Sequence, residues 1–339
     1  MGKITNAKKN KKGVFLTFVA MTIIAVYIII FTPQADISVQ KDAQSVNGRI
    51  TSIDNYFTDL KSSYFKTVLS ATTQKTVSSL VLYMNSTGSF LPNLDSAFKE
   101  VMINGTINSV PIDSITGKNI MNNNSLGSWS NRTIQAGKDT LNVNTNIIIN
   151  DVSVSQTAPW ALDSKLDIEL WIRSDVAEWR KNVTITSTVS IEGFNDPYYL
   201  LNTNGLYATQ VKKSSVEFDA WDISKAREHL RNGTYVYWKN PDAPSFLMRF
   251  TNTIANSSCC GIESLVNPNK IAQSDQRESY VDYLFWTHKY NPAANCTQIY
   301  NITNPATGGG LWDEFRFFKL DISHLTLYSI TNRDAVRNC

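Results

Sequence analysis

The sequence lacks the short motifs by which the common enzyme classes are recognised. It contains no G-x-S-x-G nucleophile turn, no phosphate-binding P-loop, no H-E-x-x-H, no G-x-G-x-x-G and no EF-hand loop. Histidine is rare, and His229, His288 and His324 are too far apart to share a metal-ligand spacing, so each is expected to be a surface or strand residue. We therefore expect no enzymatic activity, no cofactor and no metal ion.

Clustered positive charge is also missing from most of the chain. The formal net charge is only +3, and lysine and arginine form no stripe beyond the first 13 residues. Nucleic-acid-binding proteins concentrate such charge on one face, so no nucleic-acid partner is expected. The apolar content of 42% is sufficient for a packed core.

One long uncharged apolar run, residues 14–31, stands near the N-terminus. It is about as long as the roughly 18 residues that cross a bilayer as a helix. Five lysines and no acidic residue precede it, which predicts a cytoplasmic tip and an exported remainder. The sequence therefore predicts a single-pass protein of the cell membrane, with residues 1–13 cytoplasmic. A cleaved secretory signal is the rival interpretation, but no small-x-small cleavage site follows Phe31.

Residues 32–105 are predicted to form a helical stalk. An apolar stripe with alternating steps of four and three residues begins after Pro33, which marks a break or kink. Its members are Val46, Ile50, Ile53, Phe57, Leu60 and Tyr64. The stripe either packs on the chain's own exported domain or forms a coiled coil with copies of itself, and its short heptad pattern favours the first. A second helix is expected over residues 92–104, with Asp95 as its cap.

The period of the apolar pattern changes to two after residue 140. Three alternating runs, residues 143–155, 165–173 and 183–191, predict an antiparallel meander with a bulge near Asn150 and Asp151. A further helix is expected over 222–231 and strands over 280–288 and 315–322. The predicted fold class is therefore α+β: a transmembrane helix that continues into a long amphipathic helix, followed by a mainly antiparallel β-rich extracellular domain of residues 106–339. A subdivision is expected near residue 219.

Two groups of residues in the last quarter of the chain could bind sugars or a partner if they are exposed. One extends from Tyr280 to Tyr290 and the other from Phe315 to Phe318, both rich in aromatic side chains. Burial in a β core is the simpler fate and is favoured here. Acidic residues such as Asp282 and Glu314 could also meet in space as a carboxylate pair.

The four cysteines lie in the last quarter of the chain, on the predicted outer side. Their even number predicts two disulfides that clamp loops. Adjacent cysteines rarely bond to each other, so Cys259 and Cys260 are each expected to pair with Cys296 or Cys339, in either order. A zinc site would need C-x-x-C-like spacings, which are absent.

Nine Asn-x-Ser/Thr sequons follow the apolar run and are candidate glycosylation sites. They begin at Asn85, Asn104, Asn123, Asn131, Asn182, Asn232, Asn256, Asn295 and Asn301.

The N-terminal layout resembles that of archaeal type IV pilin-like proteins with class III signal peptides. The resemblance rests on Lys11, Lys12 and Gly13, the apolar helix directly after them, a proline one span later, and the amphipathic continuation, and it covers about the first 85 residues. It implies cleavage after Gly13, which would leave Val14 as the new N-terminus. Phe18 stands where many pilins carry a glutamate.

These observations together predict a membrane-anchored extracellular structural or interaction protein, either a pilin-like surface subunit or an adhesin. The alternative is an exported, membrane-tethered enzyme or glycan-binding module. The expected partners are the membrane, copies of the chain or other pilin-like subunits, and cell-surface glycans or envelope proteins.

Overall fold

The computed structural model describes residues 19–24, 26–27, 35–205, 209–216, 220–239, 242–253, 257, 259–271, 280–287, 299–302, 318–330 and 335–337. The chain divides into two compact units. The first comprises residues 1–56 with 175–177, and the second comprises residues 57–174 with 178–339.

A long helical segment begins after Pro33. Helix α2 (Ala35–Asp59) is followed by a π-helical turn, η1 (Leu60–Tyr64), and by α3 (Phe65–Thr87), which ends at Gly88 with a φ of 65°. Phe57 and Leu60 of the apolar stripe are buried. The expectation that the stripe packs within the chain is confirmed for this part of it.

Shorter helices and a small hairpin follow. They are α4 (Leu94–Asn104), β1 (Thr106–Ile107), β2 (Val110–Pro111), α5 (Ile112–Thr116) and α6 (Leu126–Leu141). Helix α4 is capped by Asn93, whose side chain accepts a hydrogen bond from Ser96 N, and not by the expected Asp95. Helix α6 occupies a stretch with little apolar pattern, because its buried face is built largely from the small residues Ser130, Thr133 and Gly137.

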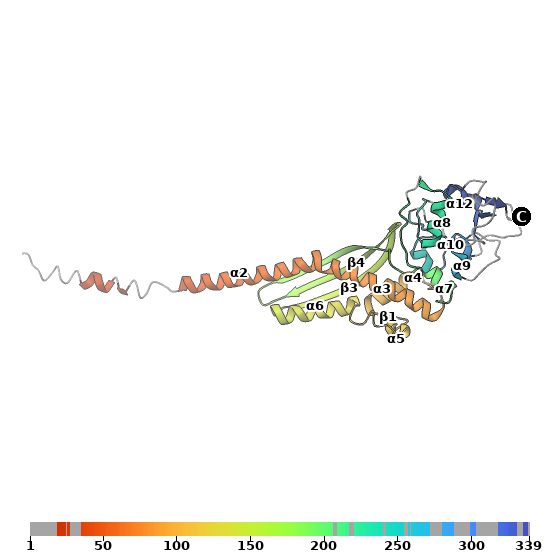
Figure 1. The fold of residues 1–339 in the computed structure, drawn as a ribbon. Helices are drawn as coiled ribbons and strands as arrows, with labels where there is room; N and C mark the ends of the chain where they lie inside the picture. The colour runs from red at the N-terminus through yellow and green to blue at the C-terminus, as the bar shows by residue number, and fades with distance from the viewer. Residues whose placement is uncertain are drawn as a thin grey trace, which may run out of the picture. The chain divides into compact units, whose positions relative to one another are not determined.

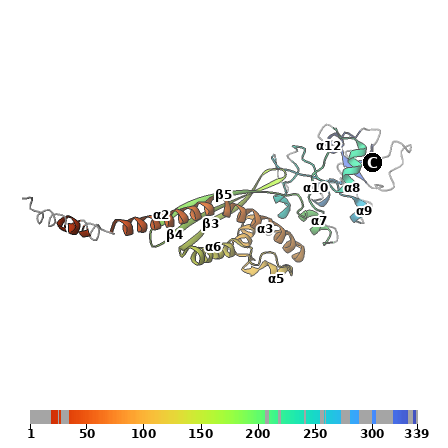
Figure 2. The same cartoon turned by 60° about the vertical axis from the view of Figure 1, so that its left-hand side comes forward.

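The central sheet of the second unit is an antiparallel meander in the order β3-β4-β5. Its strands are β3 (Asn144–Ala158), β4 (Ala161–Arg173) and β5 (Glu178–Ser190). The register shifts between Ile149 and Asp151. Both the meander and the bulge predicted from the alternation are confirmed. Helices α3, α4 and α6 cover one face of this sheet (Figures 1 and 2).

The two faces of the sheet differ in polarity, as expected when one face meets water. Leu166, Ile168 and Leu170 of β4 are fully buried towards the helices. Ser164 interrupts this row, but its Oγ lies 2.9 Å from Thr73 Oγ1 and donates to the carbonyl of Ser187, so its hydroxyl is satisfied. The other face carries acidic residues and threonines.

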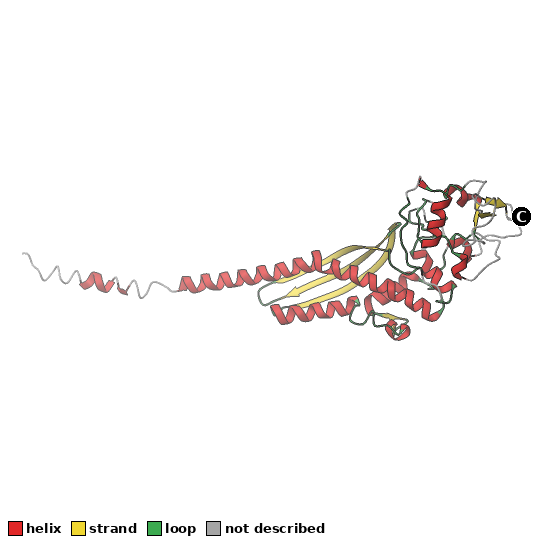
Figure 3. Ribbon diagram, viewed as in Figure 1, coloured by secondary structure: helices red, strands yellow, loops and turns green. Residues whose placement is uncertain are grey.

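Helices and loops predominate in the C-terminal part of the second unit (Figure 3). Its elements are α7 (Pro197–Asn202), α8 (Ile223–Asn232), the 3-10 helix η3 (Leu247–Phe250), α9 (Pro268–Ile271), α10 (Asp282–Thr287), β6 (Ile299–Ile302), β7 (Lys319–Asp321), α12 (Ile322–Leu327) and β8 (Ala335–Arg337). The last three strands form an antiparallel sheet in the order β7-β6-β8. The helix predicted over 222–231 is confirmed by α8. The strand predicted over 280–288 is wrong, because α10 occupies much of that run. The strand predicted over 315–322 corresponds to β7, which covers only its residues 319–321.

The predicted fold class and the predicted single-pass localisation both require correction. Within the part of the chain that the structure describes, no helix combines the length and the apolar character needed to cross a membrane. The longest helix there, α2, has 25 residues but carries charges such as Asp36, Lys41 and Arg49. Of the apolar run 14–31, only 19–24 and 26–27 are described, and the tip with Gly13 and Val14 lies outside the described residues. The described fold is a mixture of helix and sheet instead of a membrane helix with a mainly β head.

Gly261 provides a direct test of the packing in the C-terminal part. It forms a β-bridge with Ser245, and a Cβ atom at Gly261 would approach the carbonyl oxygen of Ala243 more closely than real Cβ atoms approach other atoms. We expect Gly261→Ala to lower the free energy of unfolding by about 1–3 kcal/mol, measured by urea denaturation. The control is Gly48→Ala in α2, where nothing lies within 4 Å and alanine is the better helix former. Equal stability of the two variants would contradict this account.

Candidate functional site

A fully buried ionic cluster lies in the C-terminal part. Arg249 of η3 places its Nη1 atom 2.6 Å from Asp196 Oδ2 and 2.7 Å from Asp282 Oδ2, and its Nη2 donates to the carbonyl of Ile262. All three charged side chains have no exposed surface. Asp196 immediately precedes α7 and Asp282 begins α10, so the guanidinium joins three separate segments.

The carboxylates of this cluster have further partners. Asp196 accepts hydrogen bonds from Tyr198 N at 2.8 Å and from Tyr235 Oη at 2.7 Å, while Asp282 accepts from Ser264 Oγ at 2.9 Å. Burial raises the pKa of Asp282 to about 6, although Arg249 opposes this shift. The side chains of Arg249, Asp196 and Asp282 have no access to solvent, and their hydrogen bonds connect η3 with α10 and with the residue that precedes α7.

A second buried cluster surrounds His324. Its Nδ1 lies 2.5 Å from Asp321 Oδ2 and its Nε2 lies 3.2 Å from Glu263 Oε2. Both ring nitrogens therefore face a carboxylate, and both can donate only in the imidazolium form. Burial lowers the pKa of His324, but the two carboxylates outweigh burial and raise it to about 10.

Glu263 connects this charge to a group of aromatic rings. Its Oε1 accepts hydrogen bonds from Trp238 Nε1 at 2.7 Å and from Tyr328 Oη at 3.1 Å. The centroids of the Trp221, Trp238 and Tyr328 rings lie 5.1–5.2 Å apart in tilted and edge-to-face pairs. The buried carboxylate thus fixes the orientation of an aromatic cluster.

Trp221 and Trp238 of this cluster line a cavity of about 230 Å³, the aromatic pocket. Trp160, from the turn between β3 and β4, also lines it, as does Lys213, whose Nζ lies 5.8 Å from the centroid of the Trp160 ring. Among the described residues, the lining comprises Trp160, Lys213, Ser214, Val216, Trp221, Tyr235, Val236, Tyr237 and Trp238. None of these described residues is acidic. The pocket therefore presents flat apolar surfaces beside a cation.

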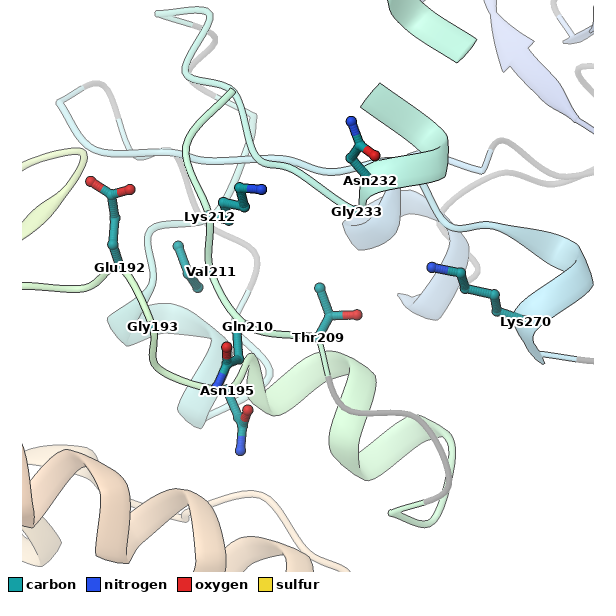
Figure 4. Close-up of a pocket in the computed structure, with 10 residues that line it drawn as sticks. All are labelled: Glu192, Gly193, Asn195, Thr209, Gln210, Val211, Lys212, Asn232, Gly233 and Lys270. Carbon is teal, nitrogen blue, oxygen red and sulfur yellow. The ribbon is translucent and has the colours of Figure 1, made fainter. Parts of the chain in front are cut away.

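A larger cavity of about 780 Å³, the polar groove, is lined by the neighbouring residues Val211 and Lys212 and by other side chains (Figure 4). Its lining comprises Glu192, Gly193, Asn195, Thr209, Gln210, Val211, Lys212, Asn232, Gly233 and Lys270. Lys270 extends into the groove from the side opposite Glu192. Thr209 is only 7% exposed, and its Oγ1 has no hydrogen-bond partner among the described residues. A buried hydroxyl without a partner is costly, so a polar ligand in the groove would gain by bonding to it.

The cysteine pairing differs from the expectation. Cys259 and Cys260 are joined to each other, with their Cα atoms 3.8 Å apart, instead of each bonding to a distant cysteine. Cys259 is exposed and Cys260 is buried. Cys296 and Cys339 lie outside the described residues.

The candidate glycosylation sites lie mostly on the surface. Asn85, Asn104, Asn123, Asn131, Asn182 and Asn232 are exposed, whereas Asn301 in β6 is half-buried. Asn256 and Asn295 lie outside the described residues. Occupancy of these sites stays a prediction.

Among the described residues that the sequence predicted as sites, Asn232 alone lines one of the two cavities, the polar groove. The expectation that His229 and His324 lie at the surface or in strands is wrong: both are in helices and buried, and burial lowers the pKa of His229 to about 3. Tyr280 and Phe285 fill the core, as favoured. The residues that sequence reasoning missed are Asp196, Arg249, Glu263 and the tryptophans of the aromatic pocket. Within the described part of the chain, no three His, Cys, Asp or Glu side chains gather as a metal site would require.

The two cavities differ in the ligand chemistry that they can accept. The aromatic pocket offers stacking surfaces and one lysine, and the polar groove offers amides, a hydroxyl and charges of both signs. Comparison with known proteins adds no ligand to either cavity: no protein-family model matches the chain, and no curated protein or solved structure matches it.

Proposed function

We propose that the chain is a structural or interaction subunit of the pilin-like surface class, which associates with copies of itself through α2 and binds its partners through the C-terminal part. The observation that supports this proposal is the exposure of one stretch of α2. Residues 43–48 are exposed on every side of the helix, and Val46 is 41% exposed.

Along residues 43–48 of α2 the side chains are exposed, so packing adds little to the intrinsic helix propensity there, and single helices of a few turns are marginal in water. Gly48 weakens that propensity further, by about 1 kcal/mol relative to alanine. Val46 and Ile50 nevertheless continue the four-residue spacing of the stripe. Packing them against the same residues of a second copy would bury this apolar surface, as in paired helices.

The test is the variant Val46→Asp in the full chain. A charge at the contact should weaken self-association at least about tenfold, because an unpaired carboxylate is costly to bury. Sedimentation equilibrium over a range of concentrations measures the effect. The matched control is Val110→Asp, which replaces a valine of similar exposure, 46%, in β2. A wild-type chain that stays monomeric, or equal effects of the two substitutions, would refute the proposal.

A glycan-binding role is the alternative that a specific observation favours, namely the aromatic pocket. The two roles are compatible, since α2 would make the subunit contact and the C-terminal part would bind the glycan. In that case the chain is an adhesin-like subunit.

A further inference from the structure

We infer that the aromatic pocket binds a single pyranose ring that carries a carboxylate, such as a glucuronate unit of an acidic glycan. This inference deepens the adhesin-like role proposed above and rests on it for the biological setting. The binding chemistry depends only on the residues that line the pocket.

The size of the pocket limits its occupant. Its volume of about 230 Å³ lies below the roughly 300–1,000 Å³ of pockets that enclose drug-sized ligands. One sugar ring, with the rest of a glycan outside, suits such a volume better than an extended chain.

The shape and rigidity of the lining favour a flat ring. A pyranose with equatorial substituents has two apolar C–H faces, which stack on aromatic side chains. Trp160 and Tyr237 are half-buried, so each retains surface that a ligand can cover. Trp238 is already fixed by Glu263, and Trp221 packs against Trp238 at 5.2 Å, so binding would order few additional side chains.

The charge of the lining favours an acidic sugar over a neutral one. Lys213 is exposed at the pocket and its Nζ lies over the Trp160 ring, within reach of the carboxylate of a uronate bound there. Lys213 is the one charged residue among the described residues of the lining. An aliphatic peptide side chain would pack against the aromatic rings but would form no ion pair with Lys213.

The experiment titrates the full chain with two matched probes, a β-1,4-linked glucuronate tetramer and the neutral glucose tetramer cellotetraose. Tryptophan fluorescence and calorimetry follow binding at low salt. The wild-type chain should bind both, and the acidic tetramer should bind about threefold more tightly, as expected for one exposed ion pair. Trp160→Ala should weaken binding of both by about tenfold, because it removes a stacking surface. Lys213→Gln should remove the preference for the acidic tetramer, so that the two tetramers bind with equal affinity.

The control variants change Trp129 and Arg132 of α6, a tryptophan and a cation that stack on each other outside the aromatic pocket. Arg132 stacks on Trp129 of α6 at 3.7 Å, so Trp129→Ala and Arg132→Gln remove a tryptophan and a cation outside the pocket. Both variants should bind as the wild-type chain does. Absence of binding to either tetramer, an equal loss in Trp129→Ala, or binding of tetraglutamate in place of the sugars would overturn the inference. Val46→Asp should keep full glycan affinity, so failure of self-association and failure of sugar binding are separate results.

Discussion

Replacing Arg249 with methionine is expected to lower the free energy of unfolding by about 3–5 kcal/mol. The substitution leaves Asp196 and Asp282 buried, close together and without their shared cation. Neither side chain has exposed surface, so water cannot replace the guanidinium. Urea denaturation of the full chain at neutral pH, followed by circular dichroism, measures the loss.

Arg180→Met is the matched control, because it removes an arginine from an ion pair at the surface. Arg180 contacts Glu169, but its side chain is 69% exposed, so the expected loss is about 0–1 kcal/mol. The triple variant Arg249→Met, Asp196→Asn and Asp282→Asn should recover part of the stability, since it removes the buried charges together. If Arg249→Met and Arg180→Met cost the same, the buried cluster does not hold the C-terminal part together.

The elements that the sequence predicts correctly are those in which local pattern and burial coincide. Leu166, Ile168 and Leu170 alternate with polar residues because one face of β4 meets helices and the other meets water. The stripe at Phe57 and Leu60 repeats at helical spacing for the same reason. Helix α6 lacks this signal, because its buried positions are mostly small or polar and look like loop residues.

The candidate sites were not predictable from spacing, because they are assembled from distant segments. Arg249 bonds to Asp196, 53 positions earlier, and to Asp282, 33 positions later. The residues that flank a buried arginine in the sequence do not distinguish it from a surface arginine, and its carboxylate partners occur at no fixed sequence separation. Trp160, Trp221 and Trp238 meet only through tertiary packing. The closely spaced aromatic residues that the sequence shows after residue 279, such as Tyr280 and Phe285, are core residues.

The stability of the chain should fall as the pH rises from 7 to 9.5, because of His324. Its folded pKa of about 10 lies above the unfolded value of about 6.5, so folding takes up a proton between these two pH values. The stabilisation by Glu263 and Asp321 is fully present below about pH 6.5 and is lost as the pH approaches 10. The expected slope is about −1.4 kcal/mol per pH unit for one proton.

The variant His324→Gln isolates this contribution. It removes the titrating group, so its free energy of unfolding, measured in urea at intervals from pH 7 to 9.5, should lack the slope. It should also be less stable than the wild type at pH 7, because Glu263 and Asp321 lose their cation. Asp282, with a pKa raised to about 6, titrates mainly below this window, and tyrosines with ordinary unfolded pKa values titrate above it. If the two chains lose stability in parallel, His324 is neutral when folded and donates a hydrogen bond to only one of the two carboxylates, Glu263 or Asp321.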